Sequence, residues 1–251
     1  RELNQQAKLA AVGQLASGIA HDFNNILGAI ILYAQMPLAH AELTPDIRDA
    51  FETILEESRR AADLVDQIRD FSRSTTMATE PIDLVALVEE AVGLLERTVP
   101  AHIDLTADLT ADPCTIQADA TRIHQVLMNL ALNARDAMPE GGELGIGVET
   151  RTIATDESSP VPEMGPGRWC CLRVSDTGTG LSEEAQAHLL EPFFTTKEDR
   201  GTGLGLAQVY GIVNQHGGFI DVDTAPGKGT TFTVFFPTGD DDGEEGGVGV
   251  D

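Results

Sequence analysis

The first third of the chain carries hydrophobic residues at spacings of three and four, a pattern typical of long amphipathic helices. Residues 3–36 predict a first helix, whose apolar positions include Val12, Leu15, Ile19, Phe23, Ile26, Ile30 and Tyr33. Pro37 breaks this pattern, and Thr44-Pro45 predicts the N-cap and first position of a second helix that continues to Arg73. A helical hairpin of this kind leaves one apolar seam exposed, so we expect two copies to pair as a dimeric four-helix bundle.

After a polar linker over Ser74–Pro81, the pattern changes to shorter, alternating elements. We expect helices over Leu84–Arg97, Ala120–Met138 and Leu204–His216, and strands over Ile103–Leu109, Glu143–Thr152, Trp169–Ser175, Phe219–Thr224 and Thr230–Phe236. Residues 154–167, rich in Pro, Ser and Gly, predict a hairpin loop. Strands and helices in this non-repeating order predict an α+β sandwich, with one sheet under a helical layer.

The charge of the chain narrows its set of partners. The sequence holds 41 acidic and 16 basic residues, a formal net charge of −25, which repels nucleic-acid backbones and anionic lipids. We therefore expect no nucleic-acid partner, and an anionic ligand would need backbone N–H groups, a few cations and a metal ion around it. No run of about 18 apolar residues occurs, so we expect no membrane contact from this fragment. A start at Arg1 rather than Met leaves room for a sensor or membrane segment upstream.

The three cysteines, Cys114, Cys170 and Cys171, lack the spacing of zinc ligands. The adjacent pair lies inside an apolar run, so we expect buried thiols rather than a disulfide or a redox pair. Reduced thiols fit a cytoplasmic location.

His21 lies in the middle of the first predicted helix. It is two residues away from both Ile19 and Phe23, which places it on the helix face opposite the apolar stripe, where its imidazole would meet water. Most exposed helical histidines have no catalytic role. Asp22 favours such a role here, because a neighbouring carboxylate can orient the ring and accept its proton as the ring attacks an electrophile.

Three further motifs carry candidate chemistry. Asn129 and Asn133 are four residues apart on one predicted helix, and two amides in register on an apolar helix favour carbonyl oxygens directed at a metal ion over ordinary surface positions. Asp176 follows an apolar run and precedes two glycines, so its carboxylate could accept a hydrogen bond from adenine N6, with a plain Asp-Gly turn as the alternative. The glycines of 201–205 open a helix and would expose N–H groups to phosphates, without matching a Walker loop or a Rossmann fingerprint.

Taken in order, six motifs resemble the H, N, G1, F, G2 and G3 boxes of sensor histidine kinases, over about residues 8–237. The motifs are 18–25, 129–137, 176–180, 191–194, 201–206 and 227–230. The form His-Asp-Phe-Asn-Asn at 21–25 is most similar to kinases that often carry PAS and receiver domains.

This resemblance implies a domain order, a reaction and partners. Residues 1–75 would form the dimerisation and histidine-phosphotransfer domain, 76–81 a linker, 82–238 an ATP-binding domain of the GHKL type, and 239–251 an acidic flexible tail. The homodimer would phosphorylate its own His21 from ATP and pass the phosphoryl group to an aspartate of a response-regulator receiver domain. Phosphatase activity towards that regulator is also implied.

The resemblance also implies residue roles. His21 would be the phosphoacceptor, Asp22 its general base, and Asn25 would position water for the phosphatase step. Asn133 would bind Mg²⁺ in a site that Asn129 lines. Asp176 would bind adenine N6. The other residues implied to contact ATP or to form the lid over it are Gly178, Gly180, Phe193, Phe194, Lys197, Arg200, Gly201, Thr202, Gly203, Leu204, Gly205, Leu206 and Thr230.

Two other functions stay open at this point. A GHKL-type ATPase that drives a conformational clamp carries a water-activating glutamate at the position of Asn129, which this chain lacks. A pseudokinase that only binds nucleotide would lack one or more boxes, whereas all are present here. Asp136 departs from the family pattern, because many histidine kinases carry Lys or Arg there, and this counts against a phosphate-binding cation from that helix.

Overall fold

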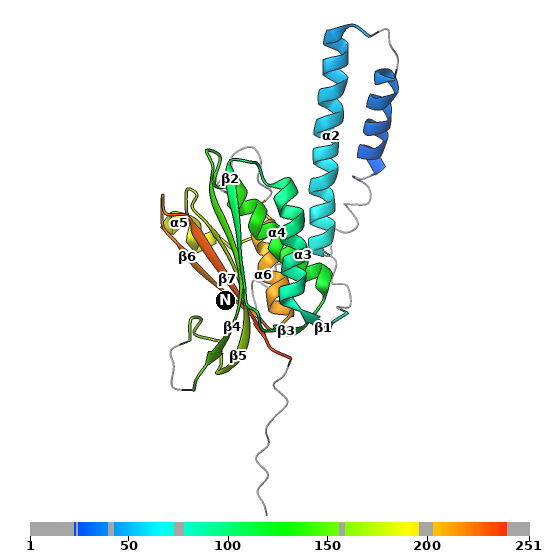
Figure 1. The fold of residues 1–251 in the computed structure, drawn as a ribbon. Coiled ribbons are helices and arrows are strands. Elements are labelled where there is room, and N and C mark those ends of the chain that lie inside the picture. Colours follow the sequence, from blue (N-terminus) through cyan, green and yellow to red (C-terminus); the bar gives the residue numbers. More distant parts are fainter. Residues whose placement is uncertain are drawn as a thin grey trace, which may run out of the picture. The chain divides into compact units, whose positions relative to one another are not determined.

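The computed structural model describes residues 23, 25–39, 43–72, 78–155, 159–195 and 203–239. The chain divides into two compact units, Arg1–Thr76 and Met77–Asp251. The first unit is a helical hairpin, and the second is a sheet covered by helices (Figure 1).

The hairpin consists of a first helix, described over residues 25–38, and α2 (Pro45–Ser72). The N–H of Arg48 donates to the carbonyl of Thr44 at 3.0 Å, which is the first helical hydrogen bond of α2. Pro45 takes the first helical position, where its missing N–H would have no helical partner in any case. The predicted start of the second helix is therefore confirmed. The first helix continues one residue past Pro37, so the proline lies in its last turn instead of ending it.

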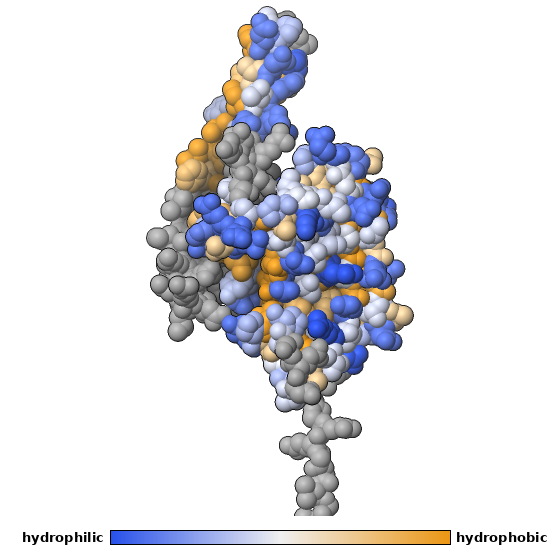
Figure 2. Space-filling model, turned by 90° about the vertical axis from the view of Figure 1, so that its left-hand side faces the viewer, coloured by the Kyte–Doolittle hydropathy of each residue, from blue (hydrophilic) through white to orange (hydrophobic). Residues whose placement is uncertain are grey.

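The first helix of this hairpin has both a covered and an exposed apolar face. Leu27 and Ala34 are buried, whereas Ile26, Ile30 and Tyr33 are 58%, 40% and 71% exposed. Figure 2 shows hydrophobic residues along one side of the hairpin. A two-helix unit covers only one face of each helix, so the seam expected for a single hairpin is present.

The second unit is built on a five-stranded sheet with the order β2-β4-β5-β7-β6. Its strands are β2 (Ile103–Leu109), β4 (Gly142–Ile153), β5 (Gly167–Asp176), β6 (Phe219–Thr224) and β7 (Thr230–Pro237). β2 and β4 run parallel, and the other neighbours are antiparallel. A separate antiparallel ribbon pairs β1 (Glu80–Asp83) with β3 (Thr115–Ala118).

Three helices cover one face of this sheet: α3 (Leu84–Thr98), α4 (Ala120–Asp136) and α6 (Gly205–Gln215) (Figure 1). A short helix, α5 (Glu183–His188), lies between β5 and α6 in the chain. The core between helices and sheet contains fully buried side chains from both layers, among them Leu84, Leu95, Ile123, Leu127, Leu144, Leu172 and Phe236. The predicted α+β sandwich, preceded by a helical hairpin, is confirmed.

The end of the predicted linker is wrong. Glu80 and Pro81 belong to strand β1, which pairs only with β3. A proline is tolerated there because one edge of a two-stranded ribbon needs no hydrogen-bond donor. β1, β3 and α5 have four, four and six residues, too few to show a hydrophobic period.

The cysteine prediction is wrong for one of the adjacent residues. Cys170 forms a disulfide with Cys114, 56 residues away in the sequence, and the Cα atoms lie 5.8 Å apart. Consecutive strand residues point to opposite faces of a sheet, so Cys171 faces away from this bond and is a free, buried thiol, as expected. It packs in a small cluster with Ile153 and Trp169, and burial raises the pKa of its thiol to about 12.

Candidate functional site

Helix α4 places two asparagines beside the core. Asp119 caps the helix by accepting a hydrogen bond from the N–H of Arg122 at 3.2 Å. Asn129 and Asn133, one turn apart, are half-buried at the edge of the helix face that packs in the core. Their placement on one helix face agrees with the sequence pattern.

The beginning of α6 lies against this asparagine pair. A Cβ added to Gly205 would lie 3.8 Å from Asn133 Nδ2 and 4.0 Å from Asn129 Cγ. The cap residue of α6, Leu204, makes no side-chain cap hydrogen bond. The positive end of the α6 dipole therefore lies next to the two amides, an arrangement that favours an anion.

Asn129 is tied to α6 by its side-chain nitrogen. Nδ2 donates to Oε1 of Gln208 at 3.0 Å and, over a longer contact of 3.4 Å, to the carbonyl of Gly205. Gln208 is 8% exposed, and its own Nε2 has no hydrogen-bond partner among the residues that the structure describes. A buried donor without a partner costs about 1–3 kcal/mol, so stability alone does not favour an amide at this position. Gln208 is not among the residues predicted from the sequence, although it is a polar residue within an apolar helical run.

Asp176 ends β5 and is 9% exposed. Its Oδ1 accepts a hydrogen bond from the N–H of Gly178 at 2.8 Å. Burial raises the pKa of the Asp176 carboxyl, and hydrogen bonds from the N–H groups of Gly178 and Thr230 partly offset this rise. A buried carboxylate with remaining acceptor capacity is suited to bind an amine or amide donor of a ligand.

The turn after Asp176 is attached to the end of α4. Thr179 N–H donates to the carbonyl of Ala137 at 3.1 Å, and Ala137 N–H donates to the carbonyl of Asn133 at 3.1 Å. A Cβ at Gly178 would lie only 2.5 Å from the Ala137 oxygen, so no side chain fits there. This close approach places the end of β5 within reach of the helix that carries the asparagines.

The resemblance implies a lid over residues 181–200, and Phe193 in its described part contacts Gly203, which follows the lid in the sequence. The N–H of Phe193 donates to the carbonyl of Gly203 at 2.9 Å, and the Phe193 ring is 54% exposed. Gly203 has φ 64°, and a side chain there would collide with the Phe193 backbone. The Phe194 ring centroid is 5.5 Å from that of His188 in α5. Phe193 and Phe194 therefore make short-range contacts with Gly203 and with His188 of α5.

The remaining predicted residues are placed as follows. Thr230 is buried at the start of β7 with its Oγ1 3.0 Å from that of Thr224, and Gly180 (φ 62°) packs against Ala225. Leu204 is buried and Leu206 packs against the core. Asn25 is exposed on the first helix. The described part of the chain does not include His21, Asp22, Lys197, Arg200, Gly201 and Thr202.

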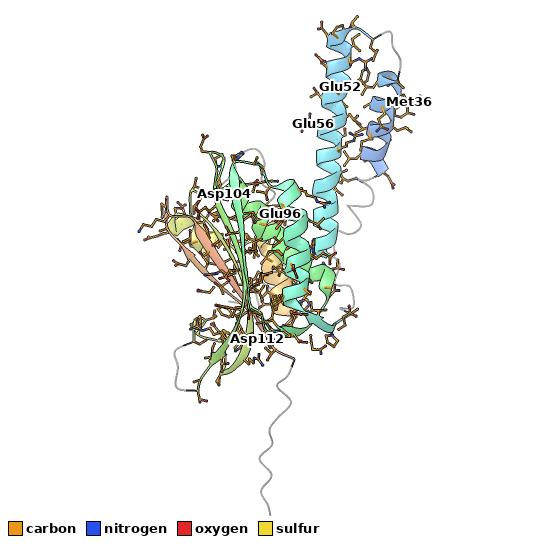
Figure 3. The ribbon with its side chains drawn as sticks, viewed as in Figure 1. Met36, Glu52, Glu56, Glu96, Asp104 and Asp112 are labelled. Carbon is orange, nitrogen blue, oxygen red and sulfur yellow. A yellow bond between two sulfur atoms is a disulfide. The ribbon has the colours of Figure 1, made fainter. Side chains whose placement is uncertain are left out.

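Acidic residues outnumber basic residues in this chain, 41 to 16. The guanidinium of Arg135, at the end of α4, donates to Asp136 at 2.7 and 3.0 Å, so this cation already has an acidic partner. Acidic side chains are exposed on both units, among them Glu52, Glu96 and Asp112, which Figure 3 labels. Within the described ranges, no group of three His, Cys, Asp or Glu residues could hold a metal ion. Amide oxygens and ligand phosphates are instead the hard oxygen donors that Mg²⁺ prefers.

Two family models match the chain. Residues 11–76 match the His Kinase A (phospho-acceptor) domain. Residues 118–240 match the histidine kinase-, DNA gyrase B-, and HSP90-like ATPase. No helix in the described part of the chain has the length and apolar character needed to cross a bilayer.

Curated proteins match over nearly the whole chain. The sensor kinase CckA of Brucella abortus (strain 2308) is 44% identical over 240 residues, which are 94% of this chain and 25% of that protein. The sensor histidine kinase ZraS of Escherichia coli (strain K12) is 32% identical over 238 residues, 94% of this chain and 48% of that protein. The chain thus spans between about a quarter and a half of the length of these relatives.

Solved structures share the fold. Full-length ShkA in complex with AMPPNP matches with a TM-score of 0.71 and 23% identity, over 89% of this chain and 45% of that chain. The catalytic domain of the histidine kinase ThkA matches with a TM-score of 0.53 and 30% identity, over 64% of this chain and 97% of that chain.

Proposed function

Because this chain belongs to the sensor histidine kinases, whose phospho-acceptor and ATPase domains it carries in that order, we propose that it transfers the γ-phosphoryl group of ATP to His21. The observation that carries the proposal is the convergence on α4. Asn133 lies on this helix, the turn after Asp176 is hydrogen-bonded to its end, and Gly205 of α6 packs beside it. One helix thereby links a carboxylate, an amide and a positive helix end.

Adenine would be bound at Asp176. The carboxylate uses part of its acceptor capacity on Gly178 and Thr230, and a further lone pair would accept the N6 amine. Gly178 and Gly180 allow the backbone to pass close to this end of the site. ShkA, which has the same fold, was solved with the ATP analogue AMPPNP.

The phosphates would lie near the beginning of α6. Asn133 would bind Mg²⁺ through its amide oxygen, and Asn129 would line the same site. The metal would supply charge neutralisation, which a chain of net charge −25 needs for an anionic ligand. Lys197 and Arg200 of the lid, followed by Gly201 and Thr202, would complete the phosphate side.

The reaction is an in-line displacement. The His21 imidazole nitrogen forms a bond to the γ-phosphorus while the bond from that phosphorus to the β–γ bridging oxygen breaks, and ADP leaves. Asp22 takes the imidazole proton. The phosphoramidate would then donate its phosphoryl group to an aspartate of a receiver domain.

The exposed seam of the hairpin, with Ile26, Ile30 and Tyr33, would be covered by a second copy of the chain in a homodimer.

The experiment is to incubate the purified chain with γ-labelled ATP and Mg²⁺, and to measure both protein-bound label and released phosphate. We expect close to one labelled phosphoryl group per acceptor site. This label should be labile to acid and stable to alkali, as a phosphohistidine is. Phosphate release over many turnovers without protein label would support a GHKL-type ATPase instead. Nucleotide binding with neither product would support a pseudokinase.

A further inference from the structure

We propose that Gln208 is a positioning residue, which orients the amide of Asn129 so that its oxygen faces the metal–nucleotide complex. The inference rests on the proposed ATP site and adds a residue to it. Gln208 lies on α6 and Asn129 on α4, 79 residues apart in the sequence, and the hydrogen bond between them joins the two helices that would hold the phosphates and the metal.

The orientation of both amides follows from one unambiguous acceptor. The carbonyl of Gly205 can only accept, so the Asn129 atom that faces it at 3.4 Å must be the nitrogen. That nitrogen also lies 3.0 Å from the Gln208 side chain, so the Gln208 atom nearest to it must be an acceptor, Oε1. The Gly205 carbonyl thus identifies which atom of the Asn129 amide faces α6, and the shorter bond to Gln208 holds the amide in that orientation.

This orientation decides what Asn129 can bind. Both hydrogens of its Nδ2 are used on α6, so Oδ1 is the part of the amide left for a ligand. Phosphate oxygens are acceptors and cannot bond to Oδ1, whereas Mg²⁺ and the waters around it can. Asn129 therefore acts on the metal side of the site.

Packing does not explain a glutamine at this position. Its neighbours on the buried face of α6 are apolar, including Ala207, Val209 and Ile212. Gln208 is itself more than nine-tenths buried, and its Nε2 has no partner among the described residues. A methionine of similar length would fill the same space without an unpaired donor. An amide that breaks the local packing rule without a gain in stability is expected at a functional site.

The test is a double-mutant cycle on the full chain with AMPPNP as the probe. Equilibrium dissociation constants are measured by calorimetry with Mg²⁺ and with EDTA, for the wild type, Asn129→Ala, Gln208→Met and the double variant. Removing a group that orients a metal ligand weakens metal affinity by about tenfold or more. Mg²⁺ should strengthen AMPPNP binding to the wild type, and we expect this enhancement to be about tenfold smaller for Gln208→Met. In EDTA, the dissociation constants of wild type and Gln208→Met should agree within about twofold. The double variant should be no weaker than Asn129→Ala alone.

Several results would overturn the assignment. If the two single substitutions weaken AMPPNP binding additively in the double variant, Gln208 does not act through Asn129. If Gln208→Met weakens AMPPNP binding equally in Mg²⁺ and in EDTA, Gln208 does not act on the metal side. Melting temperatures below that of the wild type for both Gln208→Met and Gln208→Leu would show that the amide serves packing. Asn133→Ala separates the two proposals. If the wild type shows no Mg²⁺-dependent binding, the proposed ATP site is wrong. If wild type and Asn133→Ala behave as proposed while the cycle is additive, only the role of Gln208 is wrong.

Discussion

Asp176 and Thr230 lie directly opposite each other in the β5–β7 ladder, and the N–H of Thr230 donates to the Asp176 carboxylate. Despite this hydrogen bond and the one from Gly178, burial raises the pKa of Asp176. The folded protein therefore binds a proton at Asp176 more readily than the unfolded chain does. The ionised carboxylate costs stability, and this cost appears as pH rises through the folded pKa.

Asp176→Asn should therefore raise the melting temperature at about pH 8, because it removes the buried charge and keeps an oxygen that can accept from Gly178. The gain should shrink towards pH 3.8, the ordinary pKa of an aspartate, because burial raises the pKa of Asp176 above that value and more than half of the wild-type carboxyl is then protonated. ATP affinity should fall at least about tenfold through loss of a charge-assisted hydrogen bond. Melting curves at both pH values and binding measurements check this, with the exposed Asp223→Asn on β6 as control. A lower melting temperature at pH 8 would contradict the stated effect of burial.

Asn133→Ala should raise the Mg²⁺ concentration needed for half-maximal ATP binding by about tenfold or more, because it removes the proposed metal ligand. Titration of Mg²⁺ at fixed nucleotide measures the shift. Asn214→Ala is the matched control, since Asn214 is an exposed asparagine at the far end of α6. A variant with an unchanged Mg²⁺ requirement would remove Asn133 from the metal site.

Ile30→Asp should turn the proposed homodimer into a monomer, because the dimer interface would then have to bury an unpaired charge. Light scattering coupled to size exclusion gives the mass directly. Leu94→Asp on α3, a position 48% exposed in the other unit, should stay dimeric and serves as control. If Ile30→Asp still elutes as a dimer, the two copies do not meet through the exposed seam of the first helix.

Long periodic elements were predictable from the sequence, because a repeated hydrophobic position fixes which side of an element faces the core. β2 and β6 have the predicted bounds, and α4 differs by two residues at one end. Short elements were not predictable, because the four residues of β1 or of β3 contain too few positions to distinguish a strand from a linker. Pro81 also favoured the prediction of a linker over that of a strand, since a proline next to polar residues usually indicates a loop.

The candidate site was predictable only as separate motifs. Asn129, Asn133 and Asp176 were identified from the residues beside them in the sequence, and the structure gathers these residues around α4. The contact of Asn129 with Gln208 and the pairing of Cys114 with Cys170 depend on residues 79 and 56 positions apart. Such pairs are created by the folding of the chain and leave no local pattern to read.

Asn25→Ala should keep substantial labelling of His21 but dephosphorylate the phosphorylated receiver domain much more slowly. The physical reason is that Asn25, four residues after His21 in the sequence and exposed to solvent, would orient the attacking water, which the kinase step does not need. Decay of label from a purified phosphorylated regulator, with ADP present, compares the variant with the wild type. Equal decay rates would show that Asn25 has no role in this step. So would a wild type that does not accelerate the regulator's own hydrolysis.

We propose that His21 is the phosphoacceptor. The most direct test compares the labelling of two variants, each of which lacks one histidine. Wild type, His21→Gln and His102→Gln are incubated with γ-labelled ATP and Mg²⁺, and AMPPNP binding is measured in parallel. His102 is an exposed histidine of the second unit and provides the matched control. We expect acid-labile, alkali-stable label on wild type and His102→Gln, none on His21→Gln, and equal AMPPNP affinity for all three. Labelled phosphohistidine on His21→Gln would contradict this proposal.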